Sequence, residues 1–328
     1  MRPAACNFVI LFMAKINAKV NPVRNRRRCL CLIPNGVKIL LLVVVLASLS
    51  PFIYKEAAVY YKCRKINYAL DKSVAQEAKQ FSGKYSIYVE GLGTCKFSYF
   101  YNISDKFPAA SLIKVPIMAA VFQKVNEGKL NLNSEFTLGK KDITPGSGIL
   151  RYRKVPFRIT LRKLVELMVT KSDNTAANKI IDILGFEHIN NFFLKAGLKD
   201  TLLKRRMMDF SSRRKGIENY TSCRDMAYIL KKIYKRELIN AYYSQKMLSL
   251  LKRQKINDRI PRYLPGGAVV AHKTGLEKNV VSDAGIVFSK SYDYIICVII
   301  SDFSSYKQAK DFIAKLSLTV YNTQDSYK

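Results

Sequence analysis

Apolar side chains recur along the first third of the chain with two different periods, which predict a helix followed by a hairpin. Between residues 66 and 81 they are spaced three or four apart, as on one face of a helix, and this pattern ends before Gly83. In residues 85–89 and 95–101 they alternate with other residues on either side of a glycine-containing turn. Alternation is typical of strands, so these two segments predict an antiparallel β-hairpin.

The middle of the chain is predicted to be mostly helical from residue 111 to residue 260, including helices over 111–125 and 161–169, the latter with Thr160 as N-cap. Strands return only near the C-terminus and are followed by a last helix, over residues 268–273, 281–289, 293–301 and 305–318. This order predicts an α+β fold in which five strands form one antiparallel sheet, flanked by the N- and C-terminal helices, with an all-α subdomain inserted between the second and third strands. The helix at Ser111 would begin where sheet and helical parts meet, and ligand sites commonly lie at such boundaries.

The N-terminal segment predicts a membrane-targeting region. Residues 1–55 hold nine basic residues and no acidic ones, and an uncharged run rich in Leu and Val occupies the sixteen residues 39–54. This run is short for a transmembrane helix and long for a signal core, so an uncleaved anchor and a cleaved signal both remain open. Residues 50–54 lack a small-residue cleavage site, which favours the anchor. The positive charges would keep the N-terminus in the cytoplasm and place the rest outside it, anchored to the membrane.

Three regions are therefore predicted: a basic cytoplasmic tail over residues 1–36, a membrane anchor or signal segment over 37–55, and one large domain over 56–328. Within that domain the sheet part would comprise residues 66–108 and 264–328, and the helical part residues 109–263. A domain of this size can bury a sufficient core by itself, and we expect it to be monomeric.

Composition limits the partners. The chain of 328 residues has a formal net charge of +32, and 47 basic and 24 acidic residues lie beyond residue 55. Such a surface favours anionic partners such as lipid head groups or wall polymers. Nucleic acid is not expected, because no basic motif interleaved with aromatic residues accompanies the charge. The seven cysteines and two histidines show no metal-ligand spacing, so we expect no metal and no cofactor, and interpret the cysteines mostly as small core residues.

The segment 109–118 carries the first candidate for chemistry. Ser111 and Lys114 are three residues apart at the start of an apolar helix, so both side chains lie on one face. Burial would lower the pKa of the lysine and let a neutral amine take the serine proton. The alternative is a capping serine followed by a surface lysine. The spacing alone does not decide, because Ser212 and Ser304 also precede a lysine by three residues, although neither lies in apolar surroundings.

Two further motifs follow Ser111 in the chain. In the connection after the predicted helix 161–169, Ser172 and Asn174 can point the same way while Asp173 points back to backbone groups; an ordinary helix cap is the alternative. Later, Lys273-Thr274-Gly275 ends a predicted strand at an exposed sheet edge. There the lysine and threonine offer a cation and a hydroxyl to a carboxylate, and the glycine lets a ligand approach the backbone.

The ordered set Ser111-x-x-Lys114, Ser172-Asp173-Asn174 and Lys273-Thr274-Gly275 resembles the class A β-lactamases and penicillin-binding proteins. The resemblance covers about residues 66–325 and includes the predicted sheet–helix–sheet order and the Thr-Ala-Ala-Asn that follows Asn174. It implies a β-lactamase/transpeptidase-like fold. It also implies that a β-lactam or acyl-D-alanyl compound is the substrate.

The resemblance also implies roles for individual residues. Ser111 would attack the substrate carbonyl and become acylated, Lys114 would assist removal of the serine proton, and Ser172 would relay a proton to the leaving nitrogen, helped electrostatically by Lys273. On the binding side, Asn174 would hold the side-chain amide of the substrate and Thr274 its carboxylate, next to Gly275. The backbone N–H groups of Ser111 and Leu276 would form the oxyanion hole.

One part of the class A pattern is missing. Those enzymes release the acyl group with a water activated by the glutamate of a Glu-x-x-Leu-Asn loop, and the corresponding region here, residues 203–220, is short and strongly basic. Asp209 is the carboxylate nearest to that glutamate by position, and we include it as a candidate catalytic base. The alternative is an acid that structures the loop by pairing with a neighbouring arginine.

These residues predict a serine hydrolase that opens β-lactam rings through an acyl-enzyme on Ser111, as a class A β-lactamase does. Two alternatives remain open. Without a working base the protein would act as a D,D-carboxypeptidase or penicillin-binding protein on peptidoglycan stem peptides. A non-catalytic wall-binding protein of the same fold is the other alternative, and it has no need of all three motifs.

Overall fold

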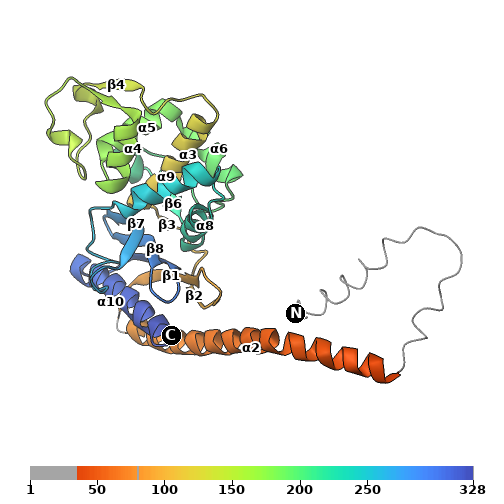
Figure 1. The fold of residues 1–328 in the computed structure, drawn as a ribbon. Coiled ribbons are helices and arrows are strands. Elements are labelled where there is room, and N and C mark those ends of the chain that lie inside the picture. Colours follow the sequence, from red (N-terminus) through yellow and green to blue (C-terminus); the bar gives the residue numbers. More distant parts are fainter. Residues whose placement is uncertain (1–34, 80, 328) are drawn as a thin grey trace, which may run out of the picture. The chain divides into compact units, whose positions relative to one another are not determined.

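The computed structural model describes residues 35–79 and 81–327. The chain divides into two compact units, Met1–Ala57 and Ala58–Lys328, and the second contains the elements discussed below except for the first part of α2 (Figure 1). The predicted tail, residues 1–36, lies almost entirely outside the described residues.

The predicted five-stranded antiparallel sheet is confirmed, with the strand order β2-β1-β9-β8-β7. Its strands are β1 (Lys84–Gly91), β2 (Ser98–Tyr101), β7 (Val269–Glu277), β8 (Val280–Phe288) and β9 (Tyr294–Ser301). The first two form the predicted hairpin, and the other three follow the helical part as expected. Strand β7 lies at the edge of the sheet, which leaves one side of its backbone unpaired within the sheet.

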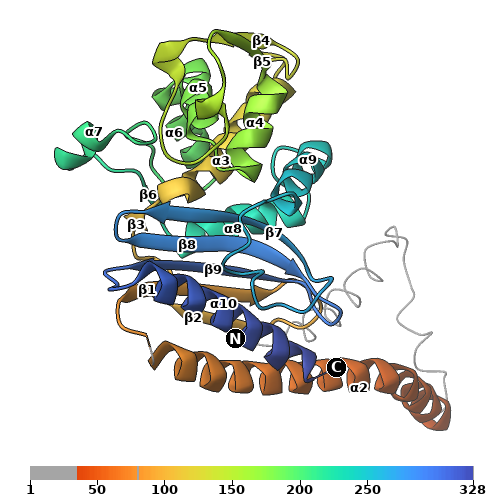
Figure 2. The same cartoon turned by 90° about the vertical axis from the view of Figure 1, so that its left-hand side faces the viewer.

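Both faces of the sheet are covered, which explains why every residue of β9 is buried. Ile295, Cys297 and Ile299 belong to the core shared with the helical part. The residues between them, including Ile296 and Val298, belong to a second core with the terminal helices. Those helices are α2 (Asn35–Lys79) and α10 (Tyr306–Asp325), and the alternation of side chains along one strand thus supports two separate cores (Figure 2).

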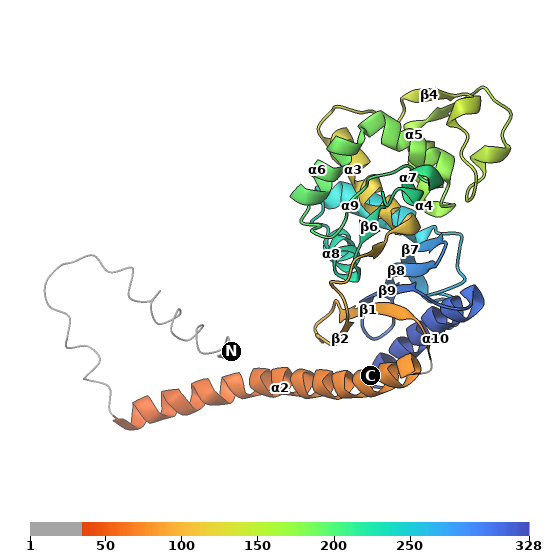
Figure 3. The ribbon, with the colours of Figure 1, turned by 180° about the vertical axis from the view of Figure 1, so that it is seen from behind.

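The helical part lies between β2 and β7 in the chain, as predicted, and α8 contacts the sheet on the face opposite α10 (Figure 3). Thr160 caps α4 by accepting a hydrogen bond from the N–H of Lys163. The elements of this part are η1 (Ala110–Ile113), α3 (Lys114–Asn126), η2 (Lys140–Asp142), η3 (Leu150–Tyr152), α4 (Leu161–Thr170), α5 (Asn174–Leu184), α6 (Phe186–Lys195), α7 (Phe210–Arg214), α8 (Cys223–Tyr234) and α9 (Ala241–Lys252).

Several predictions about element bounds were wrong. The helical part also contains two small two-stranded sheets, β3–β6 and β4–β5, formed by Phe107–Pro108 with Tyr220–Thr221 and by Glu135–Leu138 with Phe157–Thr160. Strands of two to four residues are too short to show a period. Strand β7 continues to Glu277, so Lys273-Thr274-Gly275 lies inside the edge strand instead of ending it.

No helix in the described part of the chain combines the length and the apolar character needed to span a membrane. The anchor predicted over residues 37–55 gains no support from this result, and several of its side chains lie outside the described part.

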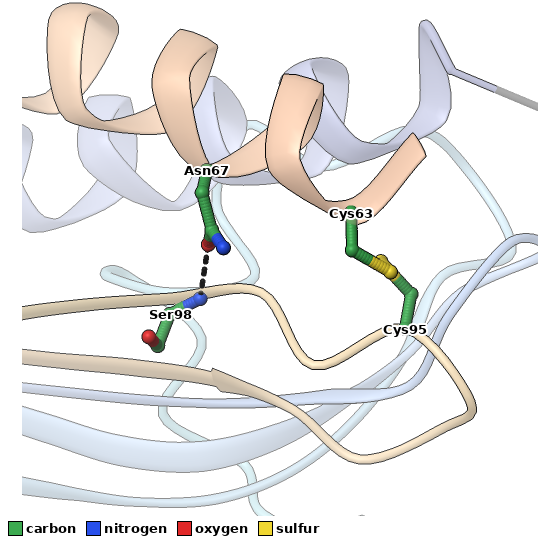
Figure 4. The surroundings of a disulfide bond; sticks show 4 residues. All are labelled: Cys63, Asn67, Cys95 and Ser98. Carbon is green, nitrogen blue, oxygen red and sulfur yellow. Dashed lines mark hydrogen bonds between the residues drawn. A yellow bond between two sulfur atoms is a disulfide. The ribbon is translucent and has the colours of Figure 1, made fainter. Parts of the chain in front are cut away.

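The cysteines were only partly predicted. Cys63 on α2 and Cys95 in the β1–β2 loop form a disulfide, whereas Cys223 and Cys297 are free and buried. Near the disulfide, Asn67 accepts a hydrogen bond of 2.8 Å from the N–H of Ser98 (Figure 4). The two bonded cysteines are 32 residues apart on different elements, so no local spacing identified the pair. Together these contacts attach α2 to the hairpin.

Candidate active site

Ser111 lies in a turn that is tighter than the α-helix predicted there, and this turn sets its position relative to Lys114. Ser111 lies in the 3-10 turn η1, and the N–H of Lys114 donates to the carbonyl of Ser111 before α3 begins. Side chains at i and i+3 eclipse one another in such a turn. Ala110, directly before Ser111, has a φ of 44°, in the left-handed region. Backbone strain of this kind is concentrated at functional sites.

The Lys114 side chain is fully buried and makes three hydrogen bonds with the next motif. Its Nζ lies 2.7 Å from the carbonyl oxygen of Ser172, 3.2 Å from the Ser172 hydroxyl and 2.7 Å from Oδ1 of Asn174. Burial lowers the pKa of Lys114 to about 7, while the Asp173 carboxylate opposes the shift. The amine is therefore substantially neutral near physiological pH, as the apolar surroundings in the sequence predict.

Asp173 fixes the loop that faces Ser111. It is the N-cap of α5 and accepts a hydrogen bond from the N–H of Ala176, while its other oxygen accepts from the N–H groups of Ile149 and Leu150. This confirms that Asp173 points back to backbone groups. The side-chain amide of Asn174 also donates to the carbonyl of Pro145 at 3.0 Å. The segment 145–150 is thereby held against the Ser172 loop.

Strand β7 places a second lysine next to the hydroxyl of Ser172. Lys273 is fully buried, and its Nζ lies 3.0 Å from Oγ of Ser172. Burial, and then the charge of Lys114, hold the pKa of Lys273 well below its ordinary value. The Ser172 hydroxyl thus lies between two amines, which is the arrangement that a proton relay requires.

Gly275 allows β7 to approach η1 closely. A Cβ atom at this position would lie 2.2 Å from Oγ of Ser282 and 3.4 Å from the side chains of Ala110 and Leu112. Because β7 is the edge strand, its unpaired side faces the turn that carries Ser111. The predicted oxyanion hole, formed by the N–H groups of Ser111 and Leu276, depends on this approach and stays a prediction.

A pocket of about 270 Å³ opens beside Ser111. Of the predicted site residues, Ser111, Asn174 and Leu276 line it, whereas Lys114, Ser172, Lys273 and Thr274 are buried and are not part of its surface. The other lining residues are Ala110 in η1, Gly146 and Ser147 after η2, Glu277 and Lys278 at the end of β7, and, in or around α7, Arg205, Met207, Met208, Phe210 and Asn219. Within the described residues no group of three or more His, Cys, Asp or Glu side chains is arranged to hold a metal ion.

The loop over residues 203–218 supplies an apolar wall. Met207 is held by the side chain of Asn178, whose amide donates to the Met207 carbonyl at 3.1 Å and whose oxygen accepts from the Met207 N–H at 2.8 Å. Met207, Met208 and Phe210 all line the pocket. This part of the pocket lining, which we call the apolar wall, therefore presents thioether and aromatic groups.

Asp209, the predicted catalytic base, has a local structural role. It caps α7, and its two oxygens accept from the N–H of Ser212 at 2.9 Å and from the Ser212 hydroxyl at 2.6 Å. These hydrogen bonds lower the pKa of Asp209. Asp209 is not among the residues lining the pocket beside Ser111. The alternative of a loop-structuring acid fits this geometry, although its partner is a serine and not an arginine.

Four charged residues connect the loop to the end of β7. Arg205 lies 2.7 Å from Glu218 and 2.6 Å from Glu277, and Arg213 lies 3.2 Å from both carboxylates. Glu277 is the one carboxylate among the residues lining this pocket, and two arginines engage it.

The sequence did not identify Asn178, Met207 or the Arg205–Glu277 contact. The only available signal was the asparagine four residues after Asn174, on the same helical face, because a buried amide needs a partner. The partners of the charged residues lie up to 72 residues away in the chain, so no local pattern connects them.

Comparisons with known proteins agree with the geometry. A family model described as "Beta-lactamase enzyme family" matches residues 69–324. A β-lactamase of Bacteroides uniformis is 24% identical over 68% of this chain and 80% of its own length, and the extended-spectrum β-lactamase PER-1 of Pseudomonas aeruginosa is 24% identical over 67% and 76%.

Solved structures give the same result. PBP-A superposes with a TM-score of 0.72 and 30% identity, covering 79% of this chain and 96% of its own. A β-lactamase of Sphaerobacter thermophilus superposes with a TM-score of 0.72 and 26% identity, covering 79% and 97%. A leucine-to-glutamate variant of PBP-A, solved as an acyl-enzyme complex with penicillin G, is also similar, with 30% identity and a TM-score of 0.72 over 79% of this chain and 97% of its own.

Proposed function

The chain belongs to the β-lactamase enzyme family, and from that premise we propose that it is a serine hydrolase that opens β-lactam rings by forming an acyl-enzyme on Ser111. The observation that carries the proposal is the buried hydrogen-bonded set in which Lys114 and Lys273 both contact the hydroxyl of Ser172. Two buried amines on one hydroxyl have no evident structural benefit. They are what acylation requires, because a proton must leave the nucleophile and reach the leaving nitrogen.

In this proposal the acylation step uses the three motifs in sequence. Neutral Lys114 takes the proton of Ser111, whose oxygen attacks the lactam carbonyl carbon. The N–H groups of Ser111 and Leu276 stabilise the oxyanion. As the C–N bond breaks, Ser172 gives its proton to the nitrogen and regains one from Lys114. Lys273 supports this transfer electrostatically, Thr274 binds the carboxylate of the substrate, and Asn174 binds its side-chain amide.

We propose further that release of the acyl group is slow. Hydrolysis of an ester requires a base that activates a water next to it. Met207, Met208 and Phe210 line the pocket beside Ser111, and Glu277 is engaged by two arginines. Both carboxylate oxygens of Asp209 accept hydrogen bonds from Ser212. These contacts support accumulation of the acyl-enzyme.

A D,D-carboxypeptidase acting on peptidoglycan stem peptides is the second candidate. The observation that favours it is the same apolar wall, since such an enzyme transfers or hydrolyses its natural acyl group without needing rapid release of a penicilloyl group. The similarity to PBP-A at 30% identity also supports it. A substrate comparison separates the two: release of D-alanine from an acyl-D-alanyl-D-alanine peptide, without rapid loss of penicillin, indicates the carboxypeptidase.

Intact-protein mass spectrometry after incubation with benzylpenicillin tests the acylation proposal. We expect one covalent adduct in the wild-type protein and none in Ser111→Ala. Ser304→Ala is the matched control, because Ser304 has the same spacing to a lysine but lies on the surface. An adduct in Ser111→Ala at the wild-type rate would refute the assignment of the nucleophile.

We also propose that the domain works outside the cytoplasm. The Cys63–Cys95 disulfide supports this, because structural disulfides persist in oxidising compartments and are rare in reducing ones. Alkylation of free thiols in intact cells, before and after reduction, tests the proposal. Two thiols that become reactive only after reduction are expected, and their full reactivity without a reductant would contradict it.

A further inference from the structure

A cluster of unneutralised positive charge lies at the end of η3 and in the residues that follow it. Arg151, Arg153 and Lys154 are exposed there, and we refer to residues 151–154 as the cationic tip. Aromatic rings lie beside both guanidinium groups: Arg151 lies 4.5 Å from the ring centre of Tyr152, to whose hydroxyl it also donates a hydrogen bond, and Arg153 lies 4.5 Å from that of Phe157. Stacking on a ring restrains the guanidinium of Arg153 while leaving its N–H edge free to bind an anion.

The cationic tip has no acidic partner, a property that it shares among the described residues with Arg64, Arg162, Arg214 and Arg236. In residues 81–327 the tip makes no salt bridge, whereas nearby Arg158 lies 2.7 Å from Glu135. Arginines elsewhere in the described domain that do pair with a carboxylate are Arg205, Arg206, Arg213, Arg224, Arg253, Arg259 and Arg262. The tip is thus ordered by its rings but not neutralised.

The cationic tip lies close to the pocket beside Ser111. Ser147 lines that pocket, and the N–H groups of Ile149 and Leu150 are bonded to Asp173. Arg151 follows Ser147 by four positions, which places its Cα atom within about 14 Å of that of Ser147.

Positive charge also lies on other segments at or near the pocket. Lys278 lines the pocket and is exposed. Arg214 and Lys215 are exposed at the end of α7, which begins at Phe210 of the pocket lining, and neither makes a salt bridge with the described residues. Cations therefore lie on two separate segments of the chain that each supply residues to the pocket lining.

We infer that the cationic tip docks a polyanionic chain, bearing phosphodiester or carboxylate groups, that extends across the mouth of the acylation pocket. Guanidinium groups match phosphate and carboxylate oxygens in a bidentate geometry, and Tyr152, which is 73% exposed, adds a ring surface beside them. Cations on two separate segments, the tip and the region of Lys278 and α7, favour an extended occupant. A flat lipid surface in contact with both segments would cover the opening of the pocket and block the substrate, so a soluble polymer fits the arrangement better.

The docking itself does not depend on catalysis. What rests on the proposed function is its consequence, that an acyl donor carried on a polyanionic chain is held close to Ser111. The two can therefore fail separately.

Binding of fluorescent inorganic polyphosphate to the full-length protein, followed by anisotropy over a series of salt concentrations, tests the docking. The tip variant carries Arg151→Gln, Arg153→Gln and Lys154→Gln. The matched control carries Lys199→Gln, Lys235→Gln and Lys307→Gln, which removes the same charge from exposed positions without ion pairs. We expect the tip variant to bind at least about tenfold more weakly and to lose about two units of salt slope, since each released phosphate contact contributes about 0.7. The control should change binding by less than about twofold.

Three results would overturn the inference: equal losses in both variants, unchanged binding in the tip variant, or tip-dependent binding to phosphatidylglycerol vesicles without binding to polyphosphate. Labelling of Ser111 with fluorescent penicillin is measured in parallel and should be equal in all three proteins. Failure of wild-type labelling together with tip-dependent polyphosphate binding would reject the proposed function and leave the docking in place.

Discussion

The two walls of the pocket beside Ser111 differ in what their side chains can do. Behind one wall, which we call the polar wall, buried polar groups contact one another: Lys114 and Lys273 both reach Ser172, and Lys114 also reaches Asn174. On the apolar wall, Met207 and neighbouring apolar groups line the pocket. Arg205 and Glu277, which also line the pocket, pair with each other. In the proposed mechanism, the groups that form the acyl-enzyme and those that would release it therefore lie in different parts of the chain, and acylation can be retained without efficient release.

The largest effect is expected from removing the amine of Lys114. In Lys114→Met a chain of similar length remains, but no base takes the proton of Ser111. The rate of acylation by benzylpenicillin, measured by stopped-flow with a fluorescent penicillin, should fall by about 10³-fold. Because Ser172 and Asn174 lose a partner, thermal unfolding by circular dichroism serves as the control for folding. A folded variant that acylates within tenfold of wild type would show that Lys114 is not the base.

A carboxylate introduced into the apolar wall should accelerate release of the acyl group. Asn178 fixes the backbone of residue 207 at the pocket surface, so Met207→Glu should hold a water next to the acyl ester. We expect deacylation, measured as loss of the mass-spectrometric adduct, to accelerate by about 10²-fold. Met207→Gln is the matched control, with similar size and no base. Equal adduct lifetimes in the two variants would show that the wall does not determine release.

The pH dependence of acylation should follow the protonation of Lys114. Burial lowers the pKa of Lys114 to about 7, so the neutral amine predominates above that pH and disappears below it. The acylation rate should rise about tenfold per pH unit up to pH 7 and level off above it, because only the neutral form accepts a proton. Rates measured between pH 5 and 9 with a fluorescent penicillin give the profile. A flat profile across pH 5 to 8 contradicts a neutral Lys114 as base.

The smallest effect is expected at Asp209. Because this residue caps α7, Asp209→Ala should reduce the free energy of unfolding by about 1 kcal/mol, measured by urea denaturation. The lifetime of the penicilloyl adduct should change by less than about twofold. A large increase in adduct lifetime would instead identify Asp209 as a base for deacylation.

The polar wall was accessible from the sequence because its residues lie in short contiguous motifs. Ser111 and Lys114 share one turn, Ser172 to Asn174 form one loop, and the order of strands and helices around them follows from hydrophobic period. The extension of β7 past Gly275 was not predicted. Lys273-Thr274-Gly275 was interpreted as a site motif at the end of the strand, whereas the strand continues through it to Glu277.

The apolar wall could not be predicted in the same way. Its geometry depends on contacts between distant segments, such as Asn178 with Met207 and Arg205 with Glu277. In a basic loop, sequence proximity singled out Asp209, whereas folding directs that carboxylate toward Ser212. The disulfide between Cys63 and Cys95 also joins distant elements, and no local spacing reveals it.

The lifetime of the adduct between benzylpenicillin and Ser111 tests most directly whether the chain retains acylation without efficient release. The full-length protein is acylated, excess penicillin is removed, and intact mass is followed over time, with Met207→Glu as a parallel sample. We expect a wild-type adduct that persists for hours and a variant adduct that is lost much sooner. Sub-second release from the wild-type protein, with continuous turnover of penicillin, would contradict it.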